Sequence, residues 1–184
     1  MVIQQLVNGL ALGSVYALIA LGYSMVYGIL KLINFAHGDI FMAGAFFGYF
    51  TAVFFDNRGY FDSPTVDAQL VSSLSVTMLV AASGAAMLAI LLERIAYRPL
   101  RRAPRLVPLI TAIGASFFIE YSFLGLFGSG VKGFPEPEAL KGRITILGVT
   151  ILKTQVVVIA AAIIMLIALW LFVQRSKTGK AIQA

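Results

Sequence analysis

The sequence predicts an all-α protein that crosses a membrane several times. Of its 184 residues, 60% are hydrophobic and only 12% are charged, and the mean hydropathy is +0.93. Soluble domains contain about 25% charged residues. The apolar residues are also gathered into long uncharged runs, and a helix that crosses the hydrocarbon core of a bilayer needs about 20 of them.

Five such runs organise residues 1–184 as a single transmembrane domain. We expect spans at residues 5–30, 39–55, 68–92, 106–128 and 154–174. The second run is the shortest, and the fourth is interrupted only by Glu120. The first run is too long for the apolar core of a cleavable signal peptide and follows no basic region, so we interpret it as a retained span.

The segments between the runs are too short for another domain. One of them, Arg143–Leu152, has the sequence RITILGVTIL, which alternates weakly and is rich in β-branched residues. This composition is typical of strands, so we expect a short hairpin around Gly148.

The basic residues indicate how the spans are oriented. Five arginines follow the third run between Glu93 and Leu106, and Arg175, Lys177 and Lys180 follow the fifth. Because Lys and Arg accumulate on the cytoplasmic side of a membrane, we expect the N-terminus outside and the C-terminus in the cytoplasm. The external segment Lys132–Lys153 has four basic residues, which runs against this rule.

Several classes of function find no support in the sequence. The chain has no cysteine, which excludes disulfides and thiolate metal sites, and His37 is its only histidine. There is no G-x-x-x-x-G-K-[ST] phosphate loop and no nucleophile elbow. We therefore expect no catalytic residue, no metal ligand and no cofactor bound by this chain. The net charge of +6 comes mostly from residues that flank the runs, so nucleic-acid binding is not expected.

The segment Leu32–Phe46, LINFAHGDIFMAGAF, places Asn34, His37 and Asp39 together at the head of the shortest run. Ionisable groups at membrane depth are costly and usually face a protein interior or a wet path. Short or interrupted spans indicate discontinuous helices in transporters. The three residues are thus candidates for a translocation path or a broken helix. For a broken helix, Asn34 or Asp39 is a candidate N-cap at the start of a half-helix. The alternative is a tight cytoplasmic turn in which all three residues satisfy helix ends.

Glu120 is the second candidate within the apolar part of the chain. It lies about 20 Å along the fourth span from the basic segment, at about 1.5 Å per residue. This position is in the outer half of the membrane. The carboxylate either pairs with a Tyr, a Ser or a helix end inside the bundle, or it faces the substrate path.

Two glycine pairs predict close helix contacts. Gly9 and Gly13 form one G-x-x-x-G pair, and Gly44 and Gly48 form another. Small residues four apart let helix backbones approach closely in lipid. The contact is either within this chain or between subunits.

Four segments resemble the permease subunits of Liv-type ABC importers for branched-chain amino acids. They are Asn8–Phe46, Glu93–Arg101, Leu109–Phe118 and Arg175–Ala184. The resemblance implies the ABC importer permease fold, a membrane helix bundle with a discontinuous helix that opens at Ile33–Asp39. It also implies that Arg175, Lys177, Gly179 and Lys180 begin the cytoplasmic loop that touches the ATPase. Members of this family are longer, so the chain is expected to be a fragment or a natural truncation.

The resemblance further implies a transporter complex in a bacterial inner membrane. Its parts are a second permease subunit (identical or not), two cytoplasmic ATPase subunits that use ATP, and a periplasmic substrate-binding protein. The expected substrates are branched-chain or other neutral amino acids, with urea or short amides as the alternative. Without the resemblance, a channel or ion-coupled transporter with a proton relay of His37, Asp39 and Glu120 stays open. A membrane-embedded enzyme would need a catalytic pair of residues, and the sequence shows none.

The predicted orientation is directly testable because the chain has no native cysteine. We expect a membrane-impermeant thiol reagent, applied to intact cells, to label Asp62→Cys and to leave Arg101→Cys unlabelled until the membrane is opened. Labelling of Arg101→Cys from outside, with Asp62→Cys protected, would reverse the orientation.

Overall fold

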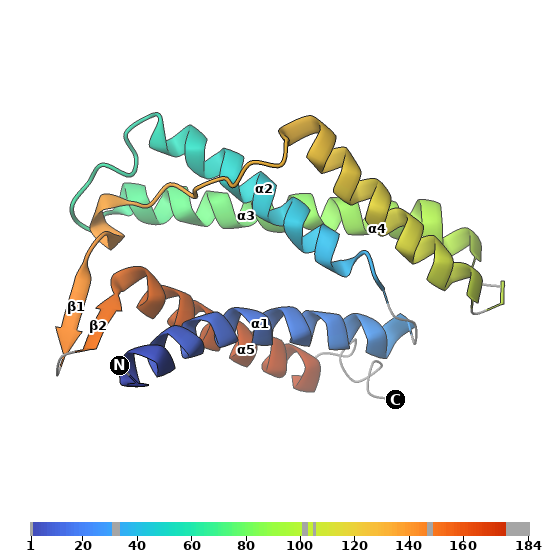
Figure 1. Ribbon diagram of the computed structural model, residues 1–184, viewed down its shortest axis with the longest axis horizontal. Helices are drawn as coiled ribbons and strands as arrows, with labels where there is room; N and C mark the ends of the chain where they lie inside the picture. The colour runs from blue at the N-terminus through green and yellow to red at the C-terminus, as the bar shows by residue number, and fades with distance from the viewer. Residues whose placement is uncertain (1, 31–33, 101–102, 105, 147–148, 176–184) are drawn as a thin grey trace. The chain divides into compact units, whose positions relative to one another are not determined.

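The computed structural model describes residues 2–30, 34–100, 103–104, 106–146 and 149–175. These residues form five α-helices that are long and apolar enough to cross a membrane (Figure 1). The helices are α1 (Val2–Leu30), α2 (His37–Asp56), α3 (Ala68–Leu92), α4 (Leu106–Phe127) and α5 (Lys153–Arg175). The prediction of an all-α, multi-pass membrane protein is confirmed. The single-domain organisation and the limits of the spans in the bilayer stay predictions.

The chain separates into two compact units. The first consists of Met1–Lys31 and Leu140–Ala184, and the second of Leu32–Ala139. The first unit holds α1, the strands β1 (Arg143–Ile146) and β2 (Val149–Leu152), and α5. The second holds α2, α3, a π-helical turn η1 (Glu93–Tyr97), a 3-10 turn η2 (Arg98–Leu100) and α4.

In the first unit, β1 and β2 form an antiparallel hairpin in which Ile144 lies opposite Ile151. The predicted hairpin is confirmed, while Gly148 lies outside the described residues. Helices α1 and α5 run in the same direction (Figure 1). The second turn of α1 and the first turn of α5 are joined by a hydrogen bond of 3.0 Å from Gln155 Nε2 to Asn8 Oδ1.

The start of α1 is bound to the hairpin by Gln4. Its side-chain amide donates to the Thr150 carbonyl at 2.7 Å and accepts from the Thr150 N–H at 2.9 Å. A strand at the edge of a sheet leaves such backbone groups unpaired, and Gln4 satisfies both of them. The side chain of Gln155 accepts from the Leu152 N–H at 3.1 Å, which is half of a capping box at the start of α5.

In the second unit, α2 is one uninterrupted helix of 20 residues, which is about 30 Å at 1.5 Å per residue. It is longer than its uncharged run because it includes His37 and Asp39 at its start and Asp56 at its end. Regular α-helix is lost instead at the end of α3, in η1 and η2. Pro99 lies there, and a proline removes one helical hydrogen bond and crowds the carbonyl four residues before it.

Helix α2 packs on α3 through small residues. A Cβ added at Gly44 would lie 3.1 Å from the Ala85 Cβ, and one at Gly48 would lie 3.4 Å from the Ala81 Cβ. On the α3 side, a Cβ added at Gly84 would collide with the ring of Phe47. The absence of side chains at these positions allows the two helices to approach closely.

Gly9 and Gly13 differ from Gly44 and Gly48. Both are exposed in α1, and a Cβ added at either would meet no atom within 4 Å. Gly44 and Gly48 therefore make a contact within the chain, whereas the contact expected for Gly9 and Gly13 stays a prediction.

Local sequence fixes two of the helix ends in the second unit. Asp67 is the N-cap of α3, and its Oδ1 accepts from the Leu70 N–H at 2.7 Å. This bond to the charged form holds the pKa of Asp67 below its ordinary value. Helix α4 ends where Gly128 adopts a φ of 76° and donates to the Leu124 carbonyl at 2.9 Å, because glycine enters the left-handed region without a steric penalty.

Candidate functional site

The polar segment before α2 is held by the irregular end of α3. Asn34 is only 9% exposed, and its Oδ1 accepts a hydrogen bond of 2.6 Å from the hydroxyl of Tyr97. The backbone carbonyl of Asn34 accepts from the His37 N–H at 3.2 Å, which closes the turn into α2. The Tyr97 hydroxyl thus satisfies a buried amide oxygen that would otherwise carry a desolvation cost.

Tyr97 was not identified from the sequence. It belongs to the π-helical turn η1, and such turns are frequent at functional sites. The available signal was Pro99, which predicts a disturbed helix just before it. Pro99 does not indicate which side chain contacts Asn34, because Asn34 and Tyr97 are 63 residues apart in the sequence.

Asp39, in the first turn of α2, accepts a hydrogen bond from the Ser116 hydroxyl of α4. The expectation that Asn34 or Asp39 caps α2 was wrong, since the N-cap is Ala36 and no side-chain cap is formed. Both side chains instead reach other helices.

Helices α2 and α4 run in parallel and in matched register. From the Asp39–Ser116 bond, the next contacts are the rings of Phe46 and Phe123, with centroids 5.2 Å apart, and those of Phe50 and Phe127, at 5.0 Å. The contacting residues are equally spaced along α2 and α4, as expected for one continuous seam. The polar bond closes one end of the seam, and the aromatic rings fill the other.

We refer to Asn34, Tyr97, Asp39 and Ser116 as the polar latch. It joins the start of α2 to the end of α3 and to the interior of α4. His37 is the first residue of α2 and lies between Asn34 and Asp39 in the sequence. Its side chain is half-buried. The geometry can hold helices in register. Within the part of the chain that the structure describes, no group of three His, Cys, Asp or Glu residues is placed to hold a metal ion.

Glu120 is not part of the polar latch. It is exposed, one turn after Ser116 along α4, and no hydrogen bond or ion pair joins it to another described residue. The structure therefore separates the four residues proposed for a path or broken helix. Asn34, His37 and Asp39 lie at the start of α2, and Glu120 lies farther along the parallel helix.

The proposed ATPase-coupling loop is described only at its first residue. Arg175 ends α5. Lys177, Gly179 and Lys180 lie outside the described residues, so their assignment stays a prediction.

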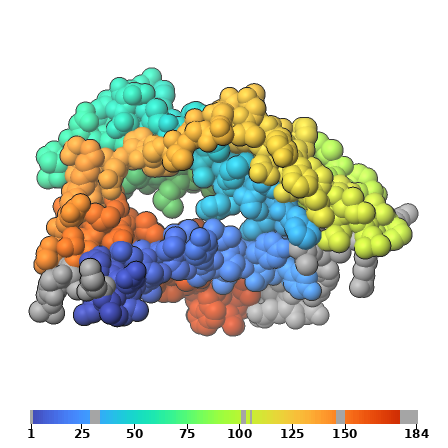
Figure 2. Space-filling model, viewed as in Figure 1, coloured from blue at the N-terminus to red at the C-terminus, as the bar shows by residue number. Residues whose placement is uncertain are grey.

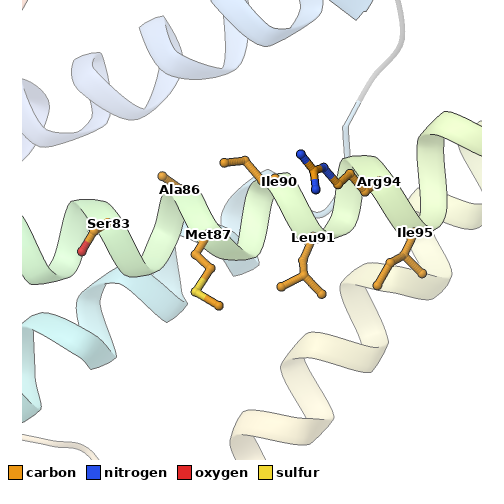
Figure 3. Close-up of a pocket in the computed structure, with 7 residues that line it drawn as sticks. All are labelled: Ser83, Ala86, Met87, Ile90, Leu91, Arg94 and Ile95. Atoms are coloured by element: carbon orange, nitrogen blue, oxygen red, sulfur yellow. The ribbon is translucent and has the colours of Figure 1, made fainter.

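A separate open hollow of about 530 Å³ lies along α3 and η1 (Figure 3). Its lining is apolar except for the hydroxyl of Ser83 and the guanidinium of Arg94, with Ala86, Met87, Ile90, Leu91 and Ile95 as the remaining residues. None of the predicted site residues lines it. Because all of its lining residues come from one continuous helical segment, the hollow has no polar groups that converge on a common point. It therefore suggests no catalytic or binding chemistry.

The fold and the site together define a multi-pass membrane protein in which a few polar side chains are hydrogen-bonded between helices.

The chain belongs to the family described as branched-chain amino acid transport system / permease component, whose family model matches residues 5–184. The permease protein BraD of the high-affinity branched-chain amino acid transport system of Pseudomonas aeruginosa is 38% identical over 186 residues. The corresponding permease protein LivH of Escherichia coli K12 is 35% identical over 187 residues, and that of Salmonella typhimurium 32% over 194.

Each of these alignments covers 99% of this chain and 58% of the relative. The chain thus spans a little over half the length of the relatives it matches. No solved structure gives a significant match.

The polar latch predicts that the Tyr97 hydroxyl stabilises the fold. We expect Tyr97→Phe to lower the free energy of unfolding in detergent or bilayer by about 1–3 kcal/mol, because the buried Asn34 oxygen loses its donor. The matched control is Tyr121→Phe, since Tyr121 is 64% exposed and its hydroxyl has no hydrogen bond among the described residues. Equal effects of the two substitutions would show that the Tyr97–Asn34 bond contributes nothing.

Proposed function

We propose that this chain acts in the membrane-embedded permease part of an ATP-driven importer of branched-chain amino acids. The observation that carries the proposal is the family match over residues 5–184. The relatives named above belong to high-affinity branched-chain amino acid transport systems and align with 99% of the chain. Five helices of membrane length support the same function.

We propose that the energy comes from partner subunits. The chain has no phosphate-binding loop, so ATP hydrolysis is placed in two cytoplasmic ATPases. Their proposed contact is the basic segment that begins at Arg175. A second permease subunit and a periplasmic substrate-binding protein complete the proposed complex.

The proposed orientation in a bacterial inner membrane has the N-terminus outside and the C-terminus in the cytoplasm. The arginine-rich segment after α3 supports it through the positive-inside rule. The helix directions within each unit fit the alternation of spans that this orientation assumes. Helices that are an even number of places apart in an alternating series must run the same way, as α1 and α5 do in the first unit and α2 and α4 do in the second.

We propose that Asn34, His37 and Asp39 serve transport by fixing the position of α2 rather than by relaying protons. Asn34 and Asp39 are each engaged by a hydroxyl of another helix. A relay of His37, Asp39 and Glu120 needs these groups to be linked to each other. The carboxylate of Asp39 is bound instead by the Ser116 hydroxyl of α4, and Glu120 has no hydrogen bond to another described residue.

The test is uptake by the complete transporter in proteoliposomes, with its ATPases and its binding protein. We expect uptake of radiolabelled leucine that requires both internal ATP and the binding protein, and no uptake of urea. Leucine uptake at full rate without ATP would indicate a channel or an ion-coupled carrier. Uptake of urea without leucine would identify the amide-type alternative.

A further inference from the structure

Glu120 is exceptional among the charged residues of the five helices. The other charged or ionisable acidic and basic side chains in these helices lie in a first or last turn, namely His37, Asp39, Asp56, Lys153 and Arg175. Glu120 lies about 10 Å before the end of α4, at about 1.5 Å per residue. A charge at this depth is costly in lipid and in most membrane proteins faces the protein interior or a water-filled cavity.

The packing of α4 places Glu120 at the edge of the seam with α2. Ser116 and Phe123 contact α2, and Ile119 is buried between them, with only 6% exposure. Glu120 follows Ser116 by four residues and precedes Phe123 by three, so it lies on the flank of this buried stripe. Its own side chain is exposed. In Figure 2, α4, in yellow, lies at the surface of the second unit.

The neighbours of Glu120 on the open side of α4 are apolar. Phe117 lies three residues before it and is 54% exposed, and Leu124 lies four residues after it and is 43% exposed. A carboxylate between two open apolar side chains matches a ligand that combines a positive charge with an aliphatic part.

A positive partner for Glu120 is absent from the helices themselves. Within the described residues, Lys and Arg occur in α1 to α5 only at the first and last residues of α5. An identical helix from a second copy would therefore bring no Lys or Arg from its interior against Glu120. This favours a cation that arrives from water over one that is supplied by an identical subunit.

We infer that Glu120 lines a water-filled path beside the α2–α4 seam and binds the ammonium group of a zwitterionic amino acid. Phe117 and Leu124 would then contact the aliphatic side chain of the same substrate. The inference rests on the proposed function and adds the residue that recognises the substrate charge. A carboxylate–ammonium contact is charge-assisted and directional, which urea and neutral amides cannot reproduce.

Water access at Glu120 is tested first, and this test is independent of transport. In the assembled complex, we expect Glu120→Cys to react with a membrane-impermeant methanethiosulfonate reagent, read as a mass increase of this chain. We expect saturating leucine with its binding protein to slow that reaction. The control is Phe118→Cys, whose parent side chain is 74% exposed on another side of α4 and should face lipid. Failure of Glu120→Cys to react would overturn the inference.

Charge recognition is tested by uptake in the complete transporter. We expect Glu120→Gln to reduce leucine uptake about tenfold or more, the loss typical of one charged hydrogen bond, with Glu120→Asp retaining more uptake. Glu136→Gln, in the exposed segment after α4, is the matched control and should transport normally. Subunit assembly is measured by co-purification.

The outcomes separate this inference from the proposed function. If the unaltered complex shows no ATP-dependent leucine uptake, the proposed function fails. If the unaltered complex transports and Glu120→Gln transports equally well, the inference about Glu120 fails alone. If Glu120→Gln disrupts assembly, Glu120 binds a partner subunit and the inference is also wrong.

Discussion

The structure depends on one constraint, which is that polar groups at membrane depth need a partner within the protein. Lipid tails offer no hydrogen bond, so an unpaired group there is costly. The hydroxyls of Ser14, Ser24, Thr51, Ser75, Thr77 and Thr111 each donate to a carbonyl of the preceding turn. The amides of Gln4 and Asn34 instead bind across elements. These longer contacts fix how the elements meet.

The same constraint explains the special position of α2. On one side, Gly44 and Gly48 bring its backbone close to α3. On the other, Asp39 binds Ser116 of α4 at one end of the seam. Helix α2 is therefore held by contacts with both of its neighbours in the second unit. Glu120 has no partner among the described residues. The same constraint is the reason for our inference that it binds a ligand.

The helices could be predicted from the sequence because membrane spans are coded locally, by uninterrupted apolar residues and by charges at their ends. The hairpin at Arg143–Leu152 was equally local. The partners of Asn34 and Asp39 could not be predicted, because Tyr97 and Ser116 lie 63 and 77 residues away and meet them only through packing. The capping prediction failed for the same reason, since a hydroxyl from another helix engaged the Asp39 carboxylate.

The central claim is that interhelical polar bonds, rather than local capping, hold the start of α2. A double-mutant cycle of Asp39→Ala and Ser116→Ala tests it most directly, with the free energy of unfolding measured in a bilayer-like detergent. The account predicts a coupling energy of about 0.5–2 kcal/mol between the two positions, as for other interacting side chains within membranes. Additive effects, with no coupling, would contradict it.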